Sequence, residues 1–261
     1  MMAKTIVFSN RKGGTGKTTL SFNIASYLAN KKYRTLLIDL DSQAHSTIHA
    51  GLNVFKLKYT IYEVLIEFIK NKKVNKDVII KTSKLDLIPS NENIAALEIE
   101  LSNFNNQNSI LKDFLIEFEK DYDFIIIDTP PSLGLITINA LVASDYLIIP
   151  VKLDFFSLVG IANMMNIYYK INSMYAPNLK LLGIIPVNLN SRAKISKEVF
   201  KEIENTFGKD KLFPFLKQDI KFVEASSHGL PIFKYSPKSS GSEAIRKISK
   251  ELLRRISNLE K

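Results

Sequence analysis

Short, unbroken apolar runs alternate along this chain with segments whose apolar residues recur every three or four positions. An unbroken run of β-branched and aliphatic residues is typical of a strand buried on both faces of a parallel sheet. We expect strands at the runs of this kind, which are Thr5–Ser9, Arg34–Leu40, Leu85–Pro89, Asp123–Asp128, Tyr146–Val151 and Leu179–Val187.

The segments between these runs have the helical period. Thr60 and Glu63 also have the spacing of a capping box, which marks a helix start. The stretch His45–Lys58 is polar and aperiodic, so irregular structure is expected there. Helices are expected around Leu20–Leu28 and Val64–Ile69, and at Asn93–Leu101, Ile110–Phe118, Ser157–Met174, Ile195–Phe207 and Glu243–Leu259. This alternation predicts an α/β fold with a doubly wound, mostly parallel sheet flanked by helices.

A glycine-rich loop joins the first expected strand to the first helix. Glycines allow several backbone N–H groups to converge on one anion, and the helix that follows adds the positive end of its dipole. In a phosphate-binding loop, Lys17 would reach the β- and γ-phosphates and the Thr18 hydroxyl would ligate magnesium. The predicted nucleotide-binding residues are Lys12, Gly13, Gly14, Thr15, Gly16, Lys17, Thr18 and Thr19.

Carboxylates end two of the expected strands. Asp39 and Asp41 close the second strand, where alternation would send both to one side with Leu40 opposite, and Asp128 closes a buried apolar run. The carboxyl ends of parallel strands are where α/β sheets bind ligands. Beside a phosphate loop, Asp39 and Asp128 are therefore predicted to hold magnesium through its waters. Considered alone, the same residues also fit a polar turn and a plain core strand.

The glycine loop resembles the "deviant" loop of the ParA/MinD group of ATPases. The standard phosphate loop has glycine where this chain has Arg11, and the second lysine, Lys12, is the feature shared with that group. The resemblance implies that Lys12 reaches the nucleotide of a partner subunit. It assigns hydrolysis to Asp41, because DLDSQ resembles the motif D-x-D-P-Q with Ser42 in place of proline. The stretch YDFIIIDTPPSLG is close to Y-D-x-I-I-I-D-x-P-P-S-L-G, which that group uses as a switch near the γ-phosphate.

The carboxyl-terminal third continues this resemblance. EASSHGLPI is similar to E-A-P-S-H-G-x-P-I, and YSPKSSG is similar to Y-D-P-K-S-x-G. The family places base contacts after the preceding strand, which makes Asn188 a candidate adenine contact. The resemblance and the basic spacing point to DNA contacts at Arg192, Lys194, Lys221, Arg246 and Lys247. Arg254 and Arg255, further along the last helix, are expected to face solvent.

The basic composition is compatible with binding to a polyanion. The net charge is +10 over 261 residues, which suits nucleic acid or an anionic membrane, although a lysine-rich, solvated surface has the same balance. Cysteine is absent, which excludes disulfides, thiol catalysis and a cysteine-bound cluster. The chain runs directly into its first strand, so we expect no signal peptide and no preceding helix-turn-helix module. One ATPase domain spanning residues 1–261 is expected.

Resemblance over nearly the whole chain identifies it as similar to a ParA/Soj-type partition ATPase. It implies a cytoplasmic, nucleoid-associated enzyme that uses ATP and Mg²⁺, forms an ATP-dependent homodimer, binds double-stranded DNA nonspecifically and is stimulated by a ParB-like partner. Two alternatives remain. One is a MinD-like membrane-associated ATPase, although the final residues add no separate apolar face and no stable membrane association is expected. The other is a ParA-like positioner of non-DNA cargo.

Overall fold

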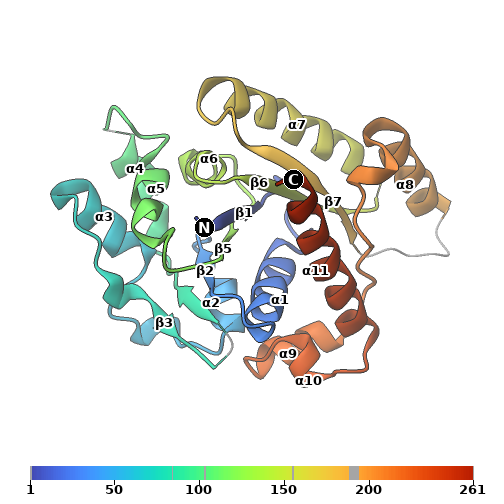
Figure 1. Cartoon of the computed structure of the whole chain (residues 1–261), viewed down its shortest axis with the longest axis horizontal. Coiled ribbons are helices and arrows are strands. Elements are labelled where there is room, and N and C mark those ends of the chain that lie inside the picture. Colours follow the sequence, from blue (N-terminus) through green and yellow to red (C-terminus); the bar gives the residue numbers. More distant parts are fainter. Residues whose placement is uncertain (1, 84, 103, 155, 188–193, 261) are drawn as a thin grey trace.

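A seven-stranded sheet organises the computed structural model, which describes residues 2–83, 85–102, 104–154, 156–187 and 194–260. The strand order is β3-β4-β2-β5-β1-β6-β7, and among the described residues only the β3–β4 pair is antiparallel (Figure 1). The strands are β1 (Lys4–Phe8), β2 (Thr35–Asp39), β3 (Ile80–Lys81), β4 (Asp86–Ile88), β5 (Phe124–Asp128), β6 (Tyr146–Lys152) and β7 (Lys180–Val187).

Helices cover both faces of this sheet. The α-helices are α1 (Lys17–Asn30), α2 (His45–His49), α3 (Ile61–Asn71), α4 (Ile94–Leu101), α5 (Ile110–Leu115), α6 (Leu135–Val142), α7 (Ser157–Met174), α8 (Lys194–Phe207), α9 (Lys221–Ser227), α10 (Ile232–Tyr235) and α11 (Ser240–Leu259). Short 3-10 turns are η1 (Val54–Lys56), η2 (Lys76–Val78), η3 (Ile116–Phe118) and η4 (Lys209–Lys211). The predicted α/β class and the doubly wound, mostly parallel sheet are therefore confirmed.

Alternate residues of the central strands enter two separate cores. In β1, Val7 belongs to the core that includes residues of α3 to α8, whereas Ile6 and Phe8 belong to the core with α1 and α11 on the other face. In a strand, successive side chains point to opposite faces, so a run buried on both sides must be apolar throughout. Figure 1 shows α1 and α11 side by side on their face. This double burial explains why the apolar runs located the strands so well.

One expectation about local structure is wrong. The stretch His45–Lys58 was expected to be irregular, yet it contains α2 and η1. Ser46 and Thr47 of α2 hydrogen-bond the buried carboxylates of Asp128 and Asp39, at 2.8 Å in each case. A five-residue helix has little stability of its own, so tertiary contacts that no periodic pattern reports determine this one. The predicted capping box is present, since the Thr60 N–H donates to Glu63 Oε2 at 2.8 Å.

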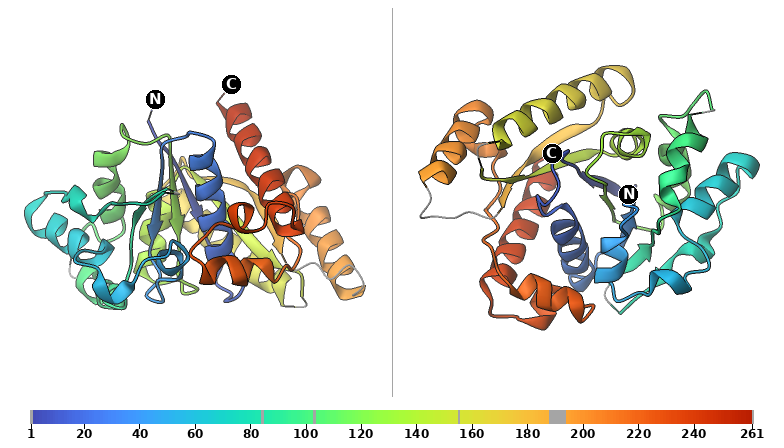
Figure 2. Two further views of the ribbon diagram at one scale, coloured as in Figure 1. Left: turned by 90° about the horizontal axis from the view of Figure 1, so that it is seen from below. Right: turned by 180° about the vertical axis from the view of Figure 1, so that it is seen from behind.

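Both edges of the sheet are short or covered. At one edge, β3 has two residues and pairs antiparallel with β4. At the other edge, the segment after η4 bridges β7 at Ile184–Leu212 and Val187–Leu216. The two chain ends lie at one end of the molecule (Figure 2), where Lys4 and Glu260 form an ion pair.

Arg255 of α11 is buried, which corrects the expectation that it faces solvent. Its Nη1 and Nη2 donate to the carbonyl oxygens of Leu182 and Leu212 at 3.0 and 2.7 Å. The guanidinium lies 4.0 Å from the centroid of the Phe213 ring. Arg255 therefore joins α11 to β7 and to the segment that covers its edge. Its neighbour Arg254 is exposed, as expected, and pairs with Glu251.

We expect Arg255→Ala to lower the free energy of unfolding by about 2–4 kcal/mol, because it leaves two carbonyl groups without their donor and removes a stacked side chain. Urea unfolding followed by circular dichroism measures this change. Arg254→Ala is the matched control and should stay within about 0.5 kcal/mol of the unmodified protein, because its ion pair is exposed. Equal unfolding midpoints for the two variants would contradict the buried role of Arg255.

Candidate functional site

The glycine loop follows β1, the strand that lies between β5 and β6 in the sheet. Gly14 and Gly16 have φ values of 70° and 81°, in the left-handed region that glycine adopts without strain. Gly16 precedes α1 without any side-chain cap, so the first N–H groups of the helix stay available to an anion. Asn10 fixes the start of the loop, since its Nδ2 donates to the Pro150 carbonyl oxygen of β6 at 2.7 Å.

A cavity of about 430 Å³ opens over this loop. Asp41 and Pro131 lie in its wall. Asp41 belongs to the loop after β2, and Pro131 belongs to the loop after β5. Of the predicted nucleotide-binding residues, all but Lys12 and Asn188 line the cavity, namely Gly13, Gly14, Thr15, Gly16, Lys17, Thr18 and Thr19. Asn188 lies outside the described residues. The cavity thus gathers the glycine loop and one strand-end carboxylate around a single space.

Lys17 is held in the floor of the site. Its side chain is nearly buried, with 6% of the residue exposed, and its Nζ donates to the Asn10 carbonyl oxygen at 3.0 Å. Burial lowers the pKa of Lys17, while the carboxylates of Asp128 and Asp41 oppose that shift. A buried ammonium group beside a glycine loop is a suitable counter-charge for a phosphate group.

Asp39 and Asp128 lie side by side beneath the cavity, as register partners of β2 and β5. Both are fully buried, and burial is the largest cause that raises the pKa of each. Thr47 donates from its N–H and its hydroxyl to Asp39 Oδ2, each at 2.8 Å. Ser46 donates to Asp128 Oδ2, whereas Asp128 Oδ1 has no hydrogen-bond partner among the described residues. A buried oxygen with that freedom can accept from a water molecule bound to magnesium.

Asp41 lies outside the strand that holds Asp39, so strand alternation does not by itself determine its direction. The strand β2 ends at Asp39, and Asp41 belongs to the turn that follows. The Asp41 N–H donates to Asp39 Oδ1 at 3.1 Å, and Asp41 Oδ1 accepts from the Gln43 N–H at 3.0 Å. The turn therefore sends Asp39 to α2 and Asp41 to the cavity. Of these two aspartates, Asp41 lines the cavity and Asp39 does not.

Lys12 points away from the cavity that its neighbours line. Its Nζ lies 2.6 and 2.5 Å from the two carboxylate oxygens of Asp154, which follows β6 in the same chain. The Lys12 ammonium also holds the pKa of Asp154 below its usual range, although burial opposes this shift. In this monomer, the ammonium group predicted to act on a partner subunit is bound within its own chain.

The cavity wall includes two histidines that the sequence pattern does not predict as site residues. His45 and His49 are four residues apart on α2, so they lie on one side of that short helix. Burial, with a smaller contribution from His45, lowers the pKa of His49 to about 4, and its ring packs edge-on against Phe22 with 5.8 Å between centroids. His49 is therefore neutral at pH 7. The i, i+4 spacing was the available signal, but the segment was expected to be irregular.

The basic residues predicted to contact DNA are only partly described. Arg192 lies outside the described residues, and Lys194 is the first residue of α8. Lys221 pairs with Glu224 at 2.7 Å, and Lys247 pairs with Glu243 at 2.8 Å, so each cation has an exposed acidic neighbour. Lys247, Lys217 and Arg246 together keep the pKa of Glu243 low. Lys217, which lies before α9, was not predicted and joins this cluster.

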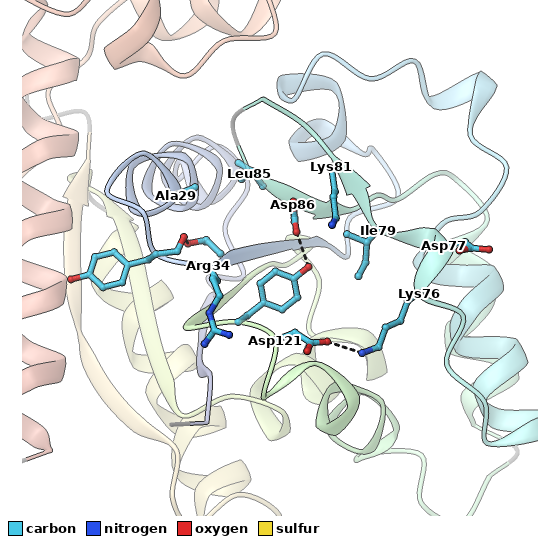
Figure 3. A pocket seen from close by; sticks show the side chains of 12 residues that line it. Ala29, Arg34, Lys76, Asp77, Ile79, Lys81, Leu85, Asp86 and Asp121 are labelled. Atoms are coloured by element: carbon cyan, nitrogen blue, oxygen red, sulfur yellow. Dashed lines mark hydrogen bonds and ion pairs between the residues drawn. The ribbon is translucent and has the colours of Figure 1, made fainter.

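A larger hollow of about 580 Å³ lies at the opposite end of the sheet, at the amino ends of β2, β4 and β5 (Figure 3). Two pairs of its polar groups bond one another. Tyr122 donates to Asp86 at 2.9 Å, and Lys76 pairs with Asp121 at 2.7 Å. The hollow has no glycine loop and no buried cation, and its size alone does not make it a site. The cavity over the glycine loop is the candidate functional site.

Comparison with known proteins agrees with this choice. A family described as "AAA domain" matches residues 3–181, which include the glycine loop, both strand-end aspartates and the cavity wall. The chain is 34% identical over 256 residues to the "Chromosome partitioning protein ParA" of Myxococcus xanthus, covering 97% of this chain and 89% of that protein. It is 34% identical over 252 residues to the "Sporulation initiation inhibitor protein Soj" of Bacillus subtilis, covering 96% and 98%.

A solved structure extends the comparison to three dimensions. The "Cobyrinic Acid a,c-diamide synthase" of Mycobacterium smegmatis, with bound ADP and magnesium, superposes with a TM-score of 0.81 at 28% identity, covering 98% of this chain and 96% of that one. Within the described residues, no helix is long and apolar enough to cross a membrane. With its glycine loop, paired strand-end aspartates and full-length similarity to ParA and Soj, the chain belongs to the ParA/Soj family of P-loop ATPases.

Proposed function

We propose that this protein is an ATP-hydrolysing DNA partition protein. The observation that carries the proposal is the cavity in which the glycine loop, buried Lys17 and Asp41 face one space of about 430 Å³. A nucleoside triphosphate presents three phosphates and needs converging N–H groups, a cation and a nearby carboxylate. Relatives named for chromosome partitioning are similar over nearly the whole chain, which supports a partition role.

ATP and Mg²⁺ fit the donors of this site. The backbone of residues 13–17 and the Lys17 ammonium would hold the phosphates, while the Thr18 hydroxyl would ligate the metal. Asp128, whose Oδ1 has no partner among the described residues, would accept a hydrogen bond from a metal-bound water. Asp39, on the adjacent strand, would also hold magnesium through its waters. The described residues contain no cluster of three acidic or histidine ligands, so this metal would depend on phosphate and water oxygens. Magnesium supplies charge neutralisation of the phosphates when bound.

Hydrolysis would use Asp41 from the cavity wall. Its carboxylate lies on the ligand side of the β2 turn, where it can orient an attacking water. Lys12 would complete the site of a second subunit, as an ammonium group that stabilises transferring charge. To do so it must leave Asp154, and a homodimer formed in the presence of ATP would provide the alternative partner.

The DNA role rests on charge. The net charge of +10 and the cluster of Lys217, Arg246 and Lys247 near the start of α11 favour phosphate contacts that carry no base information. Lys221, at the start of α9, would contribute one further contact. A dimer doubles such a surface, so nucleotide and DNA binding become linked. A ParB-like protein would stimulate hydrolysis and release this nucleoid-associated, cytoplasmic enzyme from DNA.

Asp41→Ala is expected to lower the ATP turnover number by at least about 100-fold, because the carboxylate that orients water is lost. Binding of ATP should persist, and the ATP-bound dimer should accumulate. Lys17→Ala should instead lose nucleotide affinity, because the counter-charge of the phosphates is removed. Phosphate release at saturating ATP and equilibrium binding of a fluorescent ATP analogue separate the two effects. Unchanged turnover in Asp41→Ala would refute its role.

Lys12→Ala is expected to weaken dimerisation with a non-hydrolysable ATP analogue by about tenfold or more, since one charge-assisted contact across the interface is lost. The affinity of the monomer for ADP should change little, because Lys12 lies outside the cavity wall. Sedimentation velocity and ADP titration measure the two quantities. A variant that dimerises as well as the unmodified protein would reject the action of Lys12 on a partner subunit.

Neutralising Lys221 or Lys247 should weaken DNA binding equally on unrelated sequences and lower the slope of log affinity against log salt by about 0.9 per residue. Gel shifts with ATP, with ADP and without nucleotide test this at several salt concentrations. Lys70→Ala is the matched control, because Lys70 belongs to α3, which lies on the other side of the molecule from α9 and α11 (Figure 1). If the unmodified protein does not bind DNA with ATP at low salt, the membrane-switch alternative becomes the better explanation.

A further inference from the structure

The loop between β5 and α6 lies against the candidate nucleotide site. It starts after Asp128, and Pro131 lines the cavity. Pro130 and Pro131 have no N–H group, so the loop cannot be held at these positions by donating backbone hydrogen bonds. Leu133 packs against the core, and hydrogen bonds at both ends of the loop also fix its position.

The first end is attached to the central strand. The Thr129 hydroxyl is fully buried and donates to the Phe8 carbonyl oxygen of β1 at 2.8 Å. The second end is attached to α6, since the Thr137 hydroxyl donates to the Ser132 carbonyl oxygen at 2.8 Å. The place of α6 thus determines the place of this end of the loop.

The first turn of α6 contains no acidic residue, and Glu98 of α4 supplies a carboxylate at this end of the helix. Gly134 precedes this helix without any side-chain cap. Glu98 Oε1 accepts from the Ile136 N–H at 3.4 Å, and a carboxylate at this end of a helix is favoured by the helix dipole. Glu98 is half-buried, whereas Ile94, Leu97 and Leu101 of α4 are buried and pack in the core, so the helix that carries Glu98 is firmly held.

The Glu98 carboxylate occupies the space in which a side chain at Gly134 would lie. A Cβ atom added at Gly134 would lie 1.8 Å from Glu98 Oε1 and 2.6 Å from Oε2. The φ of Gly134 is −79°, which any residue adopts, so an alanine here would meet the Glu98 carboxylate and no backbone strain. Since the obstructing atoms are the far end of a flexible side chain, a methyl group here would displace the carboxylate and leave the backbone in place.

The same helix is also connected to the strand-end aspartates. The Ser90 N–H, just before α4, donates at 3.0 Å to the Thr47 hydroxyl, which donates in turn to Asp39. The segment that leads into α4 therefore contacts the site through Ser90, and α4 itself contacts the 129–134 loop through Glu98.

We propose that Glu98 is a positioning residue for ATP turnover, which holds the 129–134 loop against the nucleotide cavity through the amino end of α6. The inference rests on the proposed ATPase function. It requires that loss of Glu98 and its displacement by a methyl group at Gly134 have the same effect.

Four variants test this: Glu98→Ala, Glu98→Gln, Gly134→Ala and the Glu98→Ala/Gly134→Ala double variant. Glu98→Ala and Gly134→Ala should each lower the turnover number by about tenfold or more, as expected when catalytic geometry is disturbed at a distance. The KM for ATP and the affinity for mant-ADP should stay within about twofold, because the glycine loop and Lys17 are untouched. Glu98→Gln keeps an acceptor oxygen and should retain most of the activity.

The double variant gives the sharpest result. Once Glu98 is truncated, the methyl group at Gly134 has nothing to displace, so the double variant should be no slower than Glu98→Ala. Two independent effects would instead multiply to about 100-fold, and that outcome overturns the inference. Glu100→Ala is the matched control on the same helix, because Glu100 accepts from Tyr62 of α3 at 2.8 Å and should leave turnover unchanged.

The failure of this inference is distinguishable from failure of the proposed function. If the unmodified protein turns over ATP and Glu98→Ala behaves like Glu100→Ala, only the role of Glu98 is rejected. If the unmodified protein binds nucleotide without turnover, the ATPase proposal fails. The ratio of mant-ATP to mant-ADP affinity then becomes the measurement, and an unchanged ratio in Glu98→Ala rejects the positioning role as well.

Discussion

Two carboxylates buried side by side place the strongest constraint on this molecule. Asp39 and Asp128 end adjacent strands, and neither is exposed. Charged groups that lose water must gain hydrogen bonds or opposite charge, or their pKa rises. Ser46 and Thr47 of α2 provide the hydrogen bonds, and Lys17 provides charge beside Asp128. The position of α2, the floor of the cavity and the direction of Asp41 all follow from this requirement.

The strands and the phosphate loop could be predicted from the sequence because their causes are local. A strand buried on both faces must be apolar at every position, and a phosphate loop needs glycine and lysine at fixed spacing. What could not be predicted depends on contacts between distant residues. The α2 helix exists through bonds to Asp39 and Asp128, the burial of Arg255 depends on Leu182 and Leu212, and Lys12 turns toward Asp154, which lies far along the chain.

The two faces of the sheet carry different features of the candidate site. One face carries α1 and α11, with the phosphate loop at the start of α1 and the basic cluster near the start of α11. The other face carries α3 to α8, including α4, whose Glu98 reaches the loop after β5. Both faces meet at the carboxyl ends of the same strands, where the cavity lies.

The construction of the sheet edges has a consequence for how this protein behaves at high concentration. An exposed strand edge offers unpaired N–H and C=O groups to another chain, and long flat edges promote aggregation. Here one edge ends in a two-residue antiparallel strand, and the other is bridged by the segment near Leu212 and Leu216. Neither edge offers a long template for strand addition. Copies of this chain at high concentration are thereby protected from joining sheet to sheet into fibres.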